Sequence, residues 1–247
     1  MNILIIIAVL SFTIMMMIET AAFAARAAGR LIGKPALGTT IHHSLFTASR
    51  FLLISFLPIL GFLVESNISY EKYFLTAVLC LSSSFLGSFI IIIYLNKVQN
   101  FFQKVFYLYK SSTIPVALLS AIFSRKKYEI KYVDLNLKLT SDRLIPKKVF
   151  VSFLAYSFLG TGFFIAFLLS LIYTDYRLTL SQFTAVFHGF GAIIVSFYLD
   201  PMLSRSIDQI KSNNMWLNNL YSILIGRIIS YFVTSIIFVS VYYLFFK

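Results

Sequence analysis

The chain has 247 residues, of which 59% are hydrophobic and only 12% are charged. A typical soluble domain is about 45–50% apolar and about 25% charged, so a water-soluble domain of this composition would expose large apolar patches and aggregate. The net charge of +12 would suit a nucleic-acid partner, but most of the basic residues lie in connections between apolar stretches. That placement indicates topology and attraction to anionic membrane lipids instead of nucleic-acid binding. The composition therefore predicts an all-α integral membrane protein.

Six apolar stretches are long enough to span a bilayer, which takes about 20 mostly apolar residues in a helix. They cover about 3–25, 42–64, 73–95, 149–173, 179–200 and 218–245. Their apolar runs are continuous and do not alternate, unlike those of barrel strands. The first stretch resembles a secretory signal, but no Lys or Arg precedes it and Glu19 interrupts it, so we expect it to stay as a span.

The basic residues are distributed unequally between the two sides of the predicted membrane. Sixteen Lys and Arg residues lie in the connections that follow the first, third and fifth spans, against three on the opposite side. Because positively charged connections stay in the cytoplasm, both chain termini are expected outside.

The long connection 96–148 divides the chain into 1–95, with three spans, the basic cytoplasmic loop itself, and 149–247, with three more. Within the loop, 98–109 shows helical spacing of apolar residues and 114–124 is a short apolar run. These features predict amphipathic helices on the inner membrane face, and 125–148 is predicted to be a loop or a small hairpin. Two triplets that start on opposite sides suggest inverted halves, as in secondary transporters.

Ionisable residues in the first span point to a polar site, because a charge within a bilayer is costly unless it is paired or hydrated. Glu19, Arg26 and Arg30 are separated by seven and eleven residues, which places them on one helical face. Arg26 and Arg30 are expected at the cytoplasmic mouth, where simple charge anchoring is the alternative. Glu19 lies deeper, which makes charge anchoring a weaker alternative for it than for the two arginines.

Four further ionisable residues lie in later spans. Arg50 in the second span is too deep to be an anchor, so we expect it to line a polar cavity, an arrangement compatible with a salt bridge to Glu19. Arg227 in the sixth span resembles it in depth. His188 lies within the fifth span, and Asp200 marks the end of that span, where ordinary helix termination is the alternative.

Arginines at this depth suit an anionic lipid headgroup, because Arg binds phosphate through paired donors. The sequence has no nucleotide-binding loop, no nucleophile elbow and no zinc-protease motif, and its one cysteine excludes an intrachain disulfide. We therefore expect no enzyme, no metal site and no cofactor.

At these positions the chain resembles the Amj-type lipid II flippases, the bacterial alternate to MurJ. The matching segments, in order, are Ile18-Glu19-Thr20 with Arg26 and Ala28-Gly29, Ser49-Arg50, His188-Gly189-Phe190-Gly191-Ala192, and Asp200-Pro201 with Leu203-Ser204. His188 stands where the family usually has an asparagine. The length and the layout of six spans are also similar.

The resemblance implies movement of lipid II, the undecaprenyl-diphosphate-linked peptidoglycan precursor, across the bacterial cytoplasmic membrane from the inner to the outer leaflet. It implies no cofactor, and it carries over Glu19, Arg26, Arg50 and Asp200 as site residues. Arg30, His188 and Arg227 are added by the arguments from depth and helical face.

Three other functions stay open at this point. The chain could be an ion- or proton-coupled transporter of another anion or polyprenyl-linked substrate, with Glu19 and His188 as proton carriers. It could be a membrane scaffold without transport activity, or a lipid-modifying membrane enzyme. The oligomeric state and the energy source are not predicted.

Overall fold

The computed structural model describes residues 1–124, 144–208 and 213–247, and within these ranges every regular element is helical. Six segments of the described chain are long and apolar enough to cross a membrane. They are Asn2–Leu31, Pro35–Glu65, Tyr70–Ile93, Pro146–Ile172, Thr174–Asp208 and Asn214–Phe245. This confirms the predicted all-α membrane fold with six spans. Most of the loop or hairpin predicted for 125–148 lies outside the described residues.

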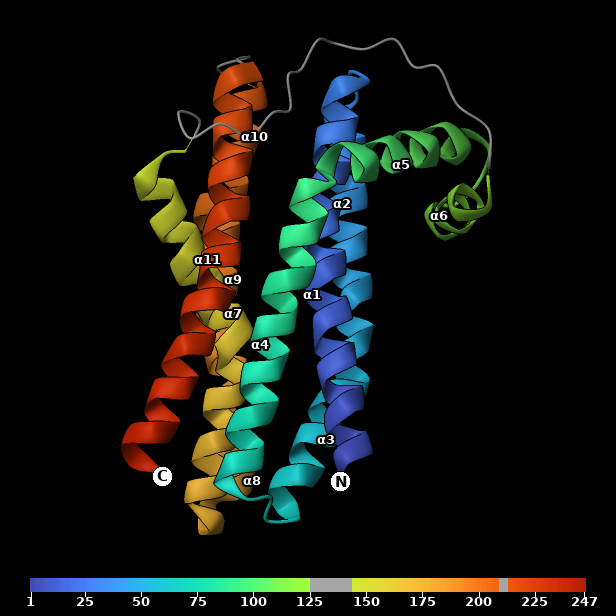
Figure 1. Cartoon of the computed structure of the whole chain (residues 1–247). Helices are drawn as coiled ribbons and strands as arrows, with labels where there is room; N and C mark the ends of the chain where they lie inside the picture. Colours follow the sequence, from blue (N-terminus) through green and yellow to red (C-terminus); the bar gives the residue numbers. More distant parts are fainter. Residues whose placement is uncertain (125–143, 209–212) are drawn as a thin grey trace.

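Four uninterrupted helices make up most of the bundle. They are α1 (Asn2–Leu31), α4 (Tyr70–Ile93), α7 (Pro146–Ile172) and α11 (Asn213–Phe245). Along their length α1 packs on α4, α4 on α11, and α11 on α7 (Figure 1). Many large apolar side chains on the outer faces are exposed, among them Ile3, Leu79 and Ile236, as expected for helices that face lipid.

The buried apolar side chains form two separate cores, one toward each end of the bundle. One core lies toward the end of the bundle with the chain termini, and it includes α1 up to Met16 and α11 from Tyr231. The other lies toward α5, and it includes α1 from Phe23 and α11 up to Ile228. The boundary between the two cores therefore lies near the middle of the spans, where Glu19 lies between the two limits in α1 and Arg227 directly precedes the limit in α11.

The second and fifth spans are not continuous α-helices. The second consists of α2 (Pro35–Ser49), the 3-10 turn η1 (Arg50–Leu52) and α3 (Leu53–Glu65). The fifth consists of η4 (Thr174–Tyr176), α8 (Arg177–Ser181), α9 (Phe183–Ile194), the π turn η5 (Val195–Leu199) and α10 (Asp200–Asp208). The prediction that this span ends at Asp200 is wrong. Pro201 occupies the start of α10, where its missing N–H is tolerated, and the helix continues to Asp208.

Glycines allow α1 and α2 to approach closely. A Cβ added to Gly29 would lie 2.6 Å from the Cα of Gly38, and one added to Gly38 would lie 2.9 Å from the carbonyl oxygen of Ala25. Small residues are common at such contacts between membrane helices, because they bring the two backbones together. The alanine-rich end of α1 is thus held against the start of the second span.

Both segments predicted as helices within the basic loop are helical, as α5 (Leu95–Leu108) and α6 (Ile114–Phe123). In Figure 1, α5 lies across one end of the bundle, where it packs on α1. Its apolar side chains Phe102, Val105 and Phe106 are buried in the neighbouring core, so this face contacts protein and is not open to lipid. Attachment of α5 and α6 to the inner membrane face stays a prediction.

Both termini lie at the end of the bundle opposite α5 (Figure 1), as an even number of spans requires. The side of the membrane that they face, the inverted relation of the two triplets, and the division at residues 95 and 148 remain predictions.

Candidate functional site

Glu19 joins three spans at mid-depth. Its side chain is buried in α1, and Oε1 lies 3.0 Å from Nη2 of Arg50 while Oε2 lies 2.9 Å from Nη2 of Arg227. Ser49 also donates its hydroxyl to Oε1, at 3.2 Å. One carboxylate therefore serves two guanidinium groups, which belong to the second and sixth spans. We refer to Glu19, Arg50 and Arg227 as the central triad.

Arg227 is the most enclosed member of the triad, with 0% of its surface exposed. Its Nη2 donates to Glu19 and to the backbone carbonyl of Met16, at 3.3 Å. The guanidinium carbon lies 4.5 Å from the ring centre of Tyr156 and 5.7 Å from that of Tyr231, within the range of cation–π attraction. Nε and Nη1 have no hydrogen-bond partner among the described residues. Because the whole side chain is buried, a ligand can reach these two donors only if the spans separate.

Arg50 occupies the 3-10 turn that interrupts the second span, and it is more open, with 20% of its side chain exposed. Its contact with Glu19 is an ion pair without the alignment of a hydrogen bond. Nη1 lies 2.9 Å from Nε2 of His188 in α9, and because Arg only donates, the imidazole nitrogen accepts. The guanidinium also lies 4.3 Å from the ring centre of Phe46. His188 is therefore joined to the triad through Arg50.

A second ion pair lies two turns further along α1, toward the end that carries α5. Nη2 of Arg26 donates to Oδ1 of Asp200 at 2.6 Å, and it lies 3.5 Å from Nε2 of His43. Arg26 is only 5% exposed, so its guanidinium is enclosed by protein, and its expected place at the cytoplasmic mouth stays a prediction. Asp200 directly follows the π turn η5, a distortion that occurs frequently at functional sites.

A small cavity of about 100 Å³ is lined by residues that contact both charged groups. Phe46 and Tyr156 contact the arginines of the central triad, while His43 and Asp200 contact Arg26. Ser196 from the π turn contributes a hydroxyl to the wall. The triad and the outer ion pair thus belong to one polar region.

Arg30 lies apart from this region. Its guanidinium carbon stands 5.5 Å from the ring centre of Trp216, near the start of α11, and the side chain is partly exposed. The structure thus brings together six of the seven expected site residues, in two connected groups, and places Arg30 at the α5 end of the bundle.

Sequence reasoning missed the aromatic and hydroxyl residues that complete the site. Tyr156 and Tyr231 flank Arg227, and Ser49 bonds to Glu19. A usable signal existed for the tyrosines, because both lie far from span ends, and a phenol hydroxyl at mid-membrane needs a polar partner. His43 shares a helical face with Arg50 in the sequence, but its place near the start of the span favoured the interpretation as an ordinary helix-start residue.

The described residues contain no group of three or more His, Cys, Asp or Glu side chains that could hold a metal ion. The chemistry that the site offers is recognition of negative charge. Three guanidinium groups share two carboxylates, and Arg227 retains unused donors in a buried position. Fold and site together define a multi-pass membrane protein whose spans enclose a cationic polar region.

The chain belongs to the Amj family, described as "Alternate to MurJ", whose family model matches residues 10–244. This membership confirms the resemblance seen in the sequence. Comparisons with curated proteins and with solved structures gave no significant match.

Proposed function

We propose that this protein is a lipid II flippase of the bacterial cytoplasmic membrane. It moves the undecaprenyl-diphosphate-linked peptidoglycan precursor from the inner to the outer leaflet, and it acts as a transporter and not as an enzyme. Two facts support the proposal: membership of a family named as an alternate to MurJ, and a cationic polar region at mid-span.

The central triad is the observation that carries the proposal. A buried guanidinium without a counter-charge is strongly destabilising, so an empty carrier for an anion needs an internal carboxylate. Glu19 supplies it for both Arg50 and Arg227. When a diphosphate arrives, it replaces the carboxylate as partner of the two arginines, and paired N–H donors make Arg well suited to phosphate.

The outer ion pair lies between the triad and the α5 end of the bundle, which is the predicted cytoplasmic end. A diphosphate approaching from that side meets Arg26 first, and Asp200 is the group that it displaces. The cavity of about 100 Å³ is too small for a diphosphate with sugars, because sites for drug-sized ligands are about 300–1,000 Å³. The spans therefore have to separate during transport, while the prenyl tail stays in lipid.

Rescue of growth in a bacterium whose own lipid II flippases can be switched off tests the proposal. The wild-type chain should restore growth. Arg50→Gln should abolish the rescue at equal membrane level, because it removes one phosphate ligand from the partly exposed side of the triad. Lys72→Gln is the matched control, since it removes one positive charge from an exposed position at the opposite end of the bundle. Failure of the inserted wild-type protein to rescue, or equal rescue by Arg50→Gln, would count against the proposal.

A further inference from the structure

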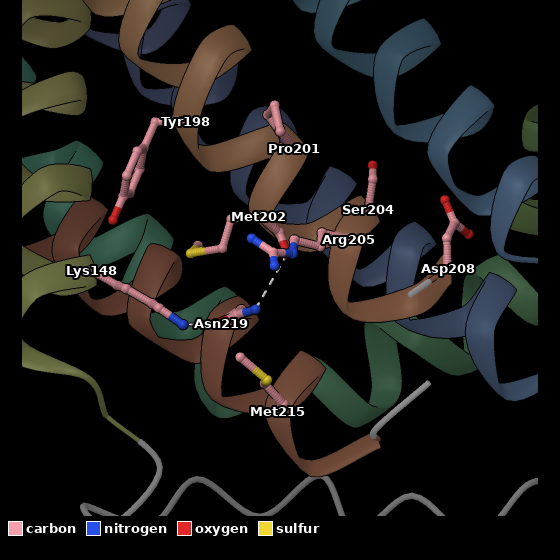
Figure 2. A pocket seen from close by; sticks show the side chains of 9 residues that line it. All are labelled: Lys148, Tyr198, Pro201, Met202, Ser204, Arg205, Asp208, Met215 and Asn219. Atoms are coloured by element: carbon pink, nitrogen blue, oxygen red, sulfur yellow. Dashed lines mark hydrogen bonds between the residues drawn. The ribbon is translucent and has the colours of Figure 1, made fainter. Parts of the chain in front are cut away.

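A cleft of about 740 Å³ opens at the α5 end of the bundle, outside the polar region described above. It lies between the start of α7, the π turn η5 with α10, and the start of α11 (Figure 2). Its volume falls within the range of about 300–1,000 Å³ that is usual for small-molecule sites. We call it the α7–α10–α11 cleft.

Two basic side chains from different spans point into this cleft. Figure 2 shows the ammonium of Lys148 and the guanidinium of Arg205 directed toward the space between the helices, while Asp208 lies further along α10. Neither Lys148 nor Arg205 has an acidic group within 4.0 Å in the described part of the chain. Asp208 also lines the cleft, but it is paired with neither cation, so the net charge of the lining is positive.

The position of Lys148 is fixed by the protein. Its Nζ donates to Oδ1 of Asn219 at 2.5 Å, and Nδ2 of the same amide donates to the backbone carbonyl of Met202. Asn219 is only 1% exposed, so a buried amide fixes the position of the Lys148 ammonium. A lysine has three N–H donors, and one is used in this bond, so two remain for a ligand.

The other walls of the cleft indicate that the ligand is amphipathic. Met202 and Met215 contribute apolar surface beside the two cations, and Tyr198 is 39% exposed at the rim. Tyrosine is enriched where a membrane protein meets the headgroup layer, because its ring is apolar and its hydroxyl is polar. Lys148 begins the fourth span and Arg205 lies near the end of the fifth, which places both at headgroup depth.

From this geometry we infer that the α7–α10–α11 cleft binds the phosphate group of an inner-leaflet lipid. Lys148 and Arg205 bind the phosphate oxygens, Asn219 keeps Lys148 in place, and the methionines contact the first part of the lipid chain. The same phosphate chemistry occurs in an anionic phospholipid and in a polyprenyl diphosphate. This site is separate from the central triad, and it does not depend on the proposed transport activity.

Native mass spectrometry of the purified full-length protein tests the inference, because it counts bound lipid molecules directly. The probes are phosphatidylglycerol, undecaprenyl diphosphate, zwitterionic phosphatidylcholine and inorganic phosphate. Lys148→Gln and Arg205→Gln should each weaken the tightest anionic-lipid binding about tenfold, the loss of one charge-assisted hydrogen bond. Lys147→Gln is the control, since it removes the same charge one residue away, at an exposed side chain that does not line the cleft.

The pattern across the probes identifies the source of the phosphate. A similar loss for both lipids would show that the phosphate group is what the cleft recognises. A loss for undecaprenyl diphosphate alone would assign the cleft to the polyprenyl carrier, and a loss for phosphatidylglycerol alone would assign it to a bilayer lipid. The inference is wrong if all three variants bind alike, if phosphatidylcholine binds as tightly, or if inorganic phosphate binds as tightly as the lipids.

Discussion

Replacement of Glu19 by glutamine tests the electrostatic reasoning about the central triad. The change keeps the shape of the side chain but removes the only negative charge within 4.0 Å of Arg50 and Arg227 in the described chain. Arg227 is fully buried, and its remaining acceptors are the carbonyl and the sulfur of Met16. Breaking a buried ion pair by removing one partner costs about 3–5 kcal/mol. At roughly 2–4 °C per kcal/mol for a chain of this size, the melting temperature should fall by about 6–20 °C.

Thermal unfolding of the detergent-solubilised protein provides the assay, and the single tryptophan, Trp216, is its fluorescent reporter. Glu65→Gln, at an exposed position, should change stability by no more than about 0.5 kcal/mol. Adding Arg227→Met to Glu19→Gln removes the uncompensated buried charge, so the double variant should be more stable than Glu19→Gln alone. If Glu19→Gln melts together with Glu65→Gln, the carboxylate does not neutralise the arginines and the reasoning fails.

Two further predictions concern the outer ion pair and the contact between the first two spans. Asp200→Asn leaves the buried Arg26 without its counter-charge and should reduce growth rescue by at least about tenfold. The control Asp208→Asn, at an exposed position on the same helix, should rescue fully. Equal rescue by both variants would contradict a role for the ion pair. Gly29→Ala places a Cβ 2.6 Å from the Cα of Gly38 and should cost about 1–3 kcal/mol of folding stability, measured by thermal unfolding. Gly189→Ala has no neighbour within 4 Å and should be neutral or stabilising by up to about 1 kcal/mol, so a reversed order of these two variants would refute the packing argument.

The spans could be predicted because a bilayer imposes a length and an apolar composition on each helix. The depth of Glu19, Arg50 and Arg227 could be predicted for a related reason, since a charge within an apolar span is costly and needs a partner. The sequence was also compatible with a salt bridge between Glu19 and Arg50. These are local properties, which the residue pattern contains.

The pairing of the remaining charges could not be read from the sequence. Arg26 and Asp200 are 174 residues apart, and Glu19 and Arg227 are 208 apart, so both contacts depend on which helices become neighbours. The interruptions at η1 and η5 were also missed, although η1 positions Arg50 and η5 ends beside Asp200. A pattern of apolar residues does not reveal where a span changes from an α-helix to a tighter or wider turn.

Translocation of labelled lipid II by the purified protein in vesicles tests the central claim most directly. The measured quantity is the fraction of label reached by a membrane-impermeant reductant, with and without an imposed proton gradient. The wild-type protein should raise this fraction above that of protein-free vesicles, and Arg50→Gln should slow the exchange at least about tenfold, the loss of one charge-assisted contact to phosphate. A folded wild-type protein that leaves the fraction unchanged under every gradient would contradict the proposed function.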